Sequence, residues 1–295
     1  SCGVEMLTGT QRGFERNKLV ESHVFQRFLP ESDRRKDITL TRDTVYLVCT
    51  SAGEVGINIS ADHLVCDLST FDSMVQRFGR VNRFGLRDDT QIYVIPPVMF
   101  EENKLEQQRE KTLELLKQLD GDASPLAIGR LDAKARADAF APEPKILPAT
   151  DILFDSWSLT SIRGKFSGRP PVEPYLHGLN EWEPPETNVA WREEVEKITS
   201  EFQNQYKPEE LIDDYPLKPH ELLRDLSSRI FDKIEKIAKR QPKATAWLVD
   251  DDGSVEVLKL QDLAQKNRKE RINYKTVLLP PSAGGLNKGG FLDGS

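Results

Sequence analysis

The sequence has few cysteines and no long apolar run. Its three cysteines, Cys2, Cys49 and Cys66, do not have metal-ligand spacing, and two of them lie in apolar, strand-like runs. Buried thiols are ordinary in such runs, so we expect these cysteines to belong to the core. Three thiols suit a reducing compartment, and a cytoplasmic location is therefore expected. No stretch approaches the ~20 apolar residues of a membrane span.

Histidine is also scarce. The four histidines stand apart from one another and none is followed by Asp: His23, His63, His177 and His220. A metal-dependent nuclease of the HD kind needs clustered His and Asp ligands. The acidic run at 250–252 precedes a glycine, which favours a hairpin turn over a cation site. No metal site is predicted in this chain.

Positive charge is not in excess. The chain has 41 Lys and Arg against 48 Asp and Glu, a net charge of −7. Dedicated nucleic-acid binders usually carry a basic excess, so any contact with nucleic acid must be local. The phosphate-loop pattern G-x-x-x-x-G-K-[ST] is missing as well. The glycine-rich stretch at 283–290 does not replace it and is expected to be a flexible tail.

Apolar runs alternate with helical patterns in the first hundred residues, at 4–7, 44–49, 63–68 and 91–96. This alternation is typical of an α/β fold with a parallel sheet. Further on, periodicity predicts a charged helix at 101–119, an amphipathic helix at 218–239 and a hairpin at 244–260. We expect an α/β domain at 1–97, a helical linker at 98–150 and an α+β accessory region at 151–295.

The stretch 50–85 contains the residues with the clearest chemistry. Gln76, Arg80 and Arg83 are spaced i, i+4 and i+7, which predicts one helical face. The opposite face would consist of Phe71, Met74, Val75 and Phe78. Two arginines three residues apart suit the stabilisation of charge on a transferring γ-phosphoryl group. Taken alone, such a pair is more often a solvated helix surface.

The first half of this stretch follows an apolar strand. Thr50 and Ser51 lie at the carboxyl end of that strand, where open α/β sheets bind ligands. Gly53 and Gly56 permit a tight backbone path just beyond it. The strand-end turn at 50–56 is therefore followed along the chain by the segment that contains Arg80 and Arg83.

TSAGEVGINI at 50–59 resembles motif V of superfamily 2 helicases, and QRFGRVNR at 76–83 matches Q-x-x-G-R-x-x-R, their motif VI. The resemblance implies a second RecA-like motor domain, incomplete at its N-terminus. Such a domain meets ATP and Mg²⁺ bound by a first motor domain, which is not in this chain. LTGTQRGFER at 7–16 resembles a weaker motif of the same family.

Residue roles follow from this resemblance. Arg80 and Arg83 would be finger arginines, and the residues near the nucleotide would be Gln76, Gly56, Asn58 and Gly79. Asn58 departs from the Asp of many relatives. The strand contacts would be Thr50, Ser51 and Gly9. Without the first motor domain, this chain alone is expected not to hydrolyse ATP.

More narrowly, EVGINI with VQRFGRVNRFG resembles the helicase-nuclease of type I CRISPR systems. The stretches at 154–182 and 188–197 resemble the region after the helicase in the type I-G branch. The resemblance implies a motor on single-stranded DNA exposed by a guide-RNA surveillance complex. It also implies an HD nuclease domain outside this chain, which we expect beyond Ser295.

Other interpretations remain open. Motifs V and VI also occur in DNA-repair and RNA helicases. A non-catalytic module is the alternative from another class, with residues 98–295 docking partner proteins. Four aromatic residues could stack on bases, although packing is the favoured role: Trp157, Tyr175, Trp182 and Trp191.

Overall fold

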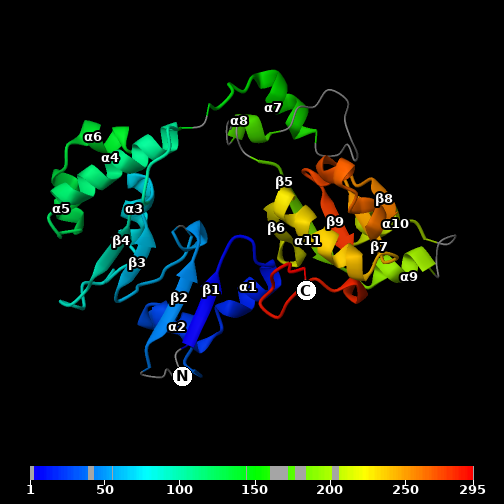
Figure 1. The fold of residues 1–295 in the computed structure, drawn as a ribbon, viewed down its shortest axis with the longest axis horizontal. Helices are drawn as coiled ribbons and strands as arrows, with labels where there is room; N and C mark the ends of the chain where they lie inside the picture. Colours follow the sequence, from blue (N-terminus) through cyan, green and yellow to red (C-terminus); the bar gives the residue numbers. More distant parts are fainter. Residues whose placement is uncertain are drawn as a thin grey trace. The chain divides into compact units, whose positions relative to one another are not determined.

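The computed structural model describes residues 3–38, 43–54, 56–143, 145–159, 172–176, 184–200 and 206–294. Cys2, His177 and Trp182 lie outside these ranges. The chain forms two compact units (Figure 1). The first comprises Ser1–Thr8 and Val20–Glu143, and the second comprises Gly9–Leu19 and Pro144–Ser295. The chain therefore passes from one unit to the other at three points.

Two pairs of parallel strands make up the sheets described in the first unit. Strand β1 (Gly3–Leu7) pairs with β2 (Val45–Cys49), and β3 (Leu64–Asp67) pairs with β4 (Ile92–Ile95). Helix α2 (His23–Phe28) and the short η1 (Glu31–Asp33) lie between the first two strands, and α3 (Phe71–Phe78) lies between the second two. Helical crossovers of this kind are what parallel neighbours require. The predicted α/β class is confirmed.

Helix α3 packs against the helices that follow β4. These are α4 (Lys104–Gln118), α5 (Pro125–Arg130) and α6 (Ala133–Asp138). Each begins at a capping side chain that accepts a backbone N–H: Asn103, Ser124 and Asp132. Such caps satisfy the free N–H groups of a first helical turn. The shared core comprises Phe71, Met74, Phe78, Leu115, Leu119 and Ile128.

This core explains why the first unit extends to Glu143. The sequence placed a domain boundary at 97 and a helical linker at 98–150, and the observed division differs from that scheme. The apolar face of α3 has to be covered, and α4 to α6 supply the cover. The charged helix expected at 101–119 is α4, and the side of α4 that bears Leu115 is buried.

The second unit is built on a five-stranded mixed sheet with the order β6-β5-β9-β7-β8. The strands are β5 (Glu186–Trp191), β6 (Leu223–Leu226), β7 (Thr245–Val249), β8 (Val255–Lys259) and β9 (Thr276–Leu279). Only the pairing of β5 with β9 is parallel among these described strands. The predicted hairpin is β7 and β8, and its turn contains Gly253 at φ +82°.

Helices cover this sheet on both faces. Helix α11 (Ser227–Arg240) buries Ile230, Ile234 and Ile237 together with Leu248 and Val277. Helices α9 (Glu194–Ser200) and α10 (Pro208–Asp214) contribute to a second cluster with Trp247 and Leu278. The remaining short elements are α1 (Gly13–Leu19), α7 (Asp151–Ser158), α8 (Glu173–Leu176), η3 (Pro219–Glu221), α12 (Leu260–Leu263), η4 (Lys266–Ile272) and η5 (Pro281–Ala283).

The helix predicted at 218–239 begins later than expected. Residues 223–226 form β6, and α11 starts only at Ser227. Leu223 and Leu226 pair with β5, so these two apolar residues belong to a strand of the sheet and not to the helix. The helical spacing of these residues was therefore misleading.

The glycine-rich end is ordered, which corrects the expected flexible tail. Asp293 donates its backbone N–H to Gly285 O at 2.8 Å, and Asn287 donates to Phe291 O at 3.0 Å. Leu292 is 2% exposed. Gly285 has φ +84° and leaves no room for a Cβ beside Ile237. The residues 284–293, here called the terminal loop, therefore pack on α11.

The terminal loop also holds residues 9–19. Gln11 Nε2 donates to Gly289 O at 2.8 Å, and Arg12 N donates to Gly290 O at 2.7 Å. Gly13 N donates to Leu222 O at 3.1 Å, and a Cβ on Gly13 would lie 2.6 Å from the Cα of His220. These contacts explain why α1, although close to β1 in sequence, belongs to the second unit.

Candidate nucleotide and nucleic-acid site

The chain turns sharply after β2. Thr50 N donates to Leu7 O at 3.2 Å, and residues Ser51–Gly53 form the 3-10 turn η2. Gly53 is buried, and a Cβ there would lie 2.7 Å from the Cβ of Cys49. Only glycine fits so close an approach. The turn presents Thr50 and Ser51 to solvent.

Gly56 lies at a second tight turn of the backbone, with φ +80°. The tight path that the two glycines predict is confirmed. Cys49, expected in the core, is exposed, whereas Cys66 is partly buried against the α3 core. Burial raises the pKa of the Cys66 thiol, partly offset by the nearby Arg77.

Helix α3 ends at Phe78, before the two arginines. Gly79 caps the helix through a backbone bond to Val75 O at 3.0 Å. Val81 then forms a parallel bridge with Ala61, and Asn82 takes φ +43°. The prediction that Gln76, Arg80 and Arg83 share one helical face is therefore wrong, because pairing with a distant segment ends the helix. Its buried face, with Phe71, Met74 and Phe78, is confirmed.

Glu54 joins the turn after β2 to helix α3. Its Oε1 lies 2.8 Å from Arg77 Nε, and its Oε2 accepts a hydrogen bond from Ser73 Oγ at 2.9 Å. Its backbone oxygen accepts two hydrogen bonds from Arg80, from Nε at 3.1 Å and from Nη2 at 2.6 Å. Arg77 Nη1 also donates to Asp67 O at 2.8 Å. Glu54 thus connects the turn after β2 to Ser73 and Arg77 of α3 and to Arg80 just beyond the helix.

Sequence reasoning did not single out Glu54 or Arg77. Arg77 occupies a position that the pattern Q-x-x-G-R-x-x-R leaves free, and Glu54 received no role from the resemblance. The available signal was the presence of a carboxylate in one segment and an unassigned arginine in the other. That signal is weak on its own because 23 residues separate the two.

The two finger candidates differ in their surroundings. Arg80 is partly buried and held by the Glu54 carbonyl. Desolvation by burial lowers the pKa of Arg80, and the charge of Arg83 lowers it further. Arg83 is exposed, and within the described ranges no carboxylate forms an ion pair with its guanidinium. Two neighbouring cations in this state favour an anion such as a phosphate.

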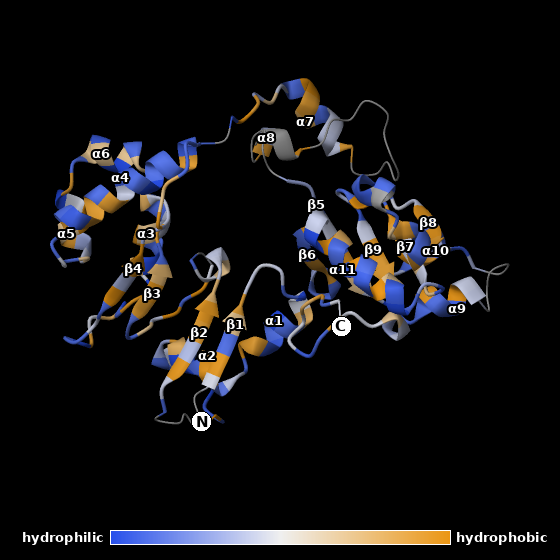
Figure 2. Cartoon of the chain, viewed as in Figure 1, coloured by the Kyte–Doolittle hydropathy of each residue, from blue (hydrophilic) through white to orange (hydrophobic). Residues whose placement is uncertain are grey.

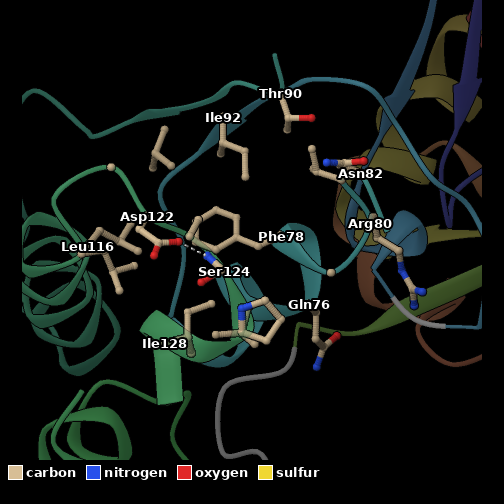
Figure 3. A pocket seen from close by; sticks show the side chains of 18 of the residues that line it. Gln76, Phe78, Arg80, Asn82, Thr90, Ile92, Leu116, Asp122, Ser124 and Ile128 are labelled. Atoms are coloured by element: carbon tan, nitrogen blue, oxygen red, sulfur yellow. Dashed lines mark hydrogen bonds between the residues drawn. The ribbon is translucent and has the colours of Figure 1, made fainter. Parts of the chain in front are cut away.

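A cavity of about 1660 Å³ adjoins these arginines. Figure 3 shows Gln76, Arg80 and Asn82 along one side of it, with Leu116, Asp122 and Ile128 on the other. The rest of the lining includes apolar side chains of β4 and of the helices, among them Ile92, Val94 and Leu113. Gly79 and Arg83 also border the cavity. The structure therefore brings four predicted site residues to one cavity: Gln76, Gly79, Arg80 and Arg83.

The other predicted site residues lie elsewhere. Asn58 is exposed, and its Nδ2 donates to Asp33 Oδ2 at 3.1 Å. Gly9 belongs to the second unit, where a Cβ on it would meet no atom within 4 Å. Trp191 Nε1 donates to Gly284 O at 2.9 Å, which agrees with the packing role expected for this aromatic residue.

Within the described ranges, no group of three His, Cys, Asp or Glu side chains is arranged to hold a metal ion. None of the helices that the structure describes is both long and apolar enough to cross a bilayer.

Residues 6–85 match a protein-family model described as the C-terminal part of the CRISPR-associated nuclease/helicase Cas3. The Cas3-like segment contains the turn after β2, Glu54, α3 and both arginines. It covers the stretches that resemble motifs V and VI, and most of the second unit lies outside it. A comparison with curated protein sequences found no match.

Solved structures of Cas3 from T. fusca also align with the chain. The ADP complex aligns at 13% identity and TM-score 0.44, covering 100% of this chain and 34% of that one. The AMPPNP complex aligns at 14% identity and TM-score 0.42, covering 95% and 32%. The chain thus spans about a third of the Cas3 chains.

Proposed function

We propose that this chain is part of an ATP-dependent superfamily 2 helicase of CRISPR interference and forms its second motor domain with an accessory region. The observation that carries the proposal is the junction between the motif V turn and the motif VI segment. Glu54 binds Arg80, while Arg83 is exposed and has no carboxylate partner among the residues that the structure describes. The match of residues 6–85 to the Cas3 family supports the same assignment.

In this proposal the arginines act on ATP held by a first motor domain. Their fit to a triphosphate rests on two neighbouring guanidiniums, one oriented by a backbone oxygen and one exposed. ATP, with Mg²⁺ held by the other domain, would supply the phosphoryl group that is transferred to water. Arg83 and Arg80 would neutralise charge on its oxygens. Gln76 and Gly79, at the same cavity, would lie near the nucleotide, with Gly56 and Asn58 in the adjoining segment.

The nucleic-acid side of the proposal rests on the exposed turn after β2. Thr50 and Ser51 present hydroxyl groups beyond the strand end, where they can donate to a strand phosphate. Gly9 would add a backbone contact. The proposed partners are single-stranded DNA, the first motor domain, a guide-RNA surveillance complex and an HD nuclease domain of the same protein. The type I-G subtype and a cytoplasmic location belong to the same proposal.

Replacement of Arg83 in the full-length protein tests the function. Arg83→Ala should lower single-stranded-DNA-stimulated ATP turnover by ~10³-fold or more, with little loss of DNA affinity. Arg87→Ala is the matched control, because Arg87 lies four residues later and forms exposed pairs with Asp62 and Asp89. Normal turnover of Arg83→Ala would show that the finger assignment is wrong.

A further inference from the structure

Glu54 is placed to control the geometry of a finger arginine without touching a nucleotide itself. Its side chain is 12% exposed and that of its partner Arg77 is 23% exposed, so this ion pair is shielded from solvent. Ser73 Oγ binds the other carboxylate oxygen. Both oxygens are thus engaged by α3, and the carboxylate is held in one orientation.

The held carboxylate fixes the backbone of the turn. Glu54 N donates to Ser51 O at 3.0 Å, so the residue closes η2. Its carbonyl oxygen is then directed at the guanidinium of Arg80, which donates to it twice. The carboxylate contacts Arg77, and the carbonyl contacts Arg80. The position of Arg80 therefore depends on the Glu54 side chain even though the bond is to its backbone.

Arg80 needs such a contact because α3 ends two residues before it. Arg80 lies beyond α3, so helical geometry does not fix its side chain. Ala61 N holds the backbone oxygen of Arg80 at 2.8 Å, and the Glu54 carbonyl holds the guanidinium. A catalytic group displaced by ~1 Å can lose about 10²-fold in rate.

We propose that Glu54, acting with Arg77 and Ser73, is a positioning residue that orients Arg80 toward the nucleotide phosphates, an inference that rests on the proposed ATP hydrolysis. Because the same residue closes the turn that begins at Thr50, a shift of that turn on strand binding moves the carbonyl that holds Arg80. Glu54 is then the link through which contact at Thr50 reaches the finger arginine.

The test measures ATP turnover in the full-length protein with single-stranded DNA present. Glu54→Ala and Arg77→Ala should each lower kcat by about 10 to 10²-fold, while the KM for ATP and the DNA affinity stay within about threefold. The double variant should resemble the worse single variant, because residues that act as one unit are not additive. Glu54→Gln keeps one oxygen as the acceptor for Arg77, its amide nitrogen can donate to the Ser73 hydroxyl instead, and the variant should recover most of the activity.

A structural role is separated from a positioning role by changing Arg80 as well. In an Arg80→Lys background, under single-turnover conditions, Glu54→Ala should cause little further loss if it acts through Arg80. An equal loss in both backgrounds overturns the proposal, as does kcat of Glu54→Ala within twofold of the parent. If Arg83→Ala is inactive and Glu54→Ala is normal, only the positioning role fails. If Arg83→Ala is normal, the proposed function itself fails.

Discussion

The two units bury their sheets differently. In the second unit every residue of β7 is buried, and Trp247 is fully enclosed. In the first unit the described strands consist mainly of alternating partly buried and exposed positions, and Leu7 is their one fully buried residue. Seven apolar side chains on these strands are exposed: Val4, Met6, Tyr46, Val48, Val65, Tyr93 and Ile95. Figure 2 shows this apolar character along β1 to β4.

Parallel strands are normally covered on both faces, so the two small sheets of the first unit are unusually open. Its best-filled core lies under α3, where Phe71 and Met74 are almost fully enclosed. The candidate site joins α3 to the turn after β2 by polar contacts of Glu54. We infer that apolar packing stabilises the second unit, whereas a partly buried ion pair and hydrogen bonds set the geometry of the site in the first.

The largest expected effect is the difference in unfolding free energy between a core substitution in the second unit and a strand substitution in the first. Ile234→Ala removes a fully buried side chain of the second unit and should cost about 2–5 kcal/mol of unfolding free energy. Val65→Ala on the exposed face of the first unit, where Val65 is 69% exposed, should change it by less than about 0.5 kcal/mol. Urea unfolding followed by circular dichroism measures both.

Tryptophan emission separates the two units in this experiment. The four tryptophans, Trp157, Trp182, Trp191 and Trp247, all belong to the second unit. Their transition should move with Ile234→Ala and not with Val65→Ala. A large loss with Val65→Ala would mean that the strand face is covered in solution, and the contrast between the units would disappear.

Sequence reasoning recovered the features that local pattern determines. The apolar runs became β1 to β4, the Asp-Gly turn joined β7 to β8, and α3 buries the predicted side chains. These elements depend on residues within a few positions of one another. Gly53 and Gly56 were also recognised, because a tight path after a strand has few other solutions.

Features set by distant contacts were missed. The end of α3 depends on the bridge between Val81 and Ala61, twenty residues apart in sequence. The role of Glu54 depends on Arg77, and the order of the terminal loop depends on Ile237 and α1. Composition alone made the terminal loop look flexible. Pairings of this kind leave no periodic signal in a single sequence.

The terminal loop offers the next test of how packing stabilises the second unit. Gly290 has φ +79°, and a Cβ on it would lie 2.5 Å from the Cβ of Glu15. Gly290→Ala should therefore cost about 1–3 kcal/mol, from backbone strain and overlap with α1. Gly9→Ala, where a Cβ has open space, is the control in the same unit. Tryptophan emission during urea unfolding measures both. Equal stability of the two variants would favour the flexible tail that composition predicted.

The smallest expected effect concerns an ion pair of the second unit, for comparison with the pair of Glu54 and Arg77. Lys275 Nζ lies 2.7 Å from Asp250 Oδ2 and joins the start of β9 to the hairpin turn. The bond from Lys275 lowers the pKa of Asp250 below its ordinary 3.8. A depressed folded-state pKa gives stability that is present above about pH 3.8 and lost as the pH falls through the folded value.

The side chains of Lys275 and Asp250 are 31% and 40% exposed, so solvent screens this pair and its contribution should not exceed ~1 kcal/mol. Lys275→Met should remove that contribution, and the stability of the variant should fall less steeply below pH 4 than that of the parent. Lys197→Met, which removes a more exposed partner of Glu193, is the control and should leave the acid limb unchanged. Urea midpoints from pH 2.5 to 7 supply the comparison. If Lys275→Met instead cost several kcal/mol at neutral pH, polar contacts would stabilise the second unit as strongly as its core, and the contrast with the Glu54 pair would be wrong.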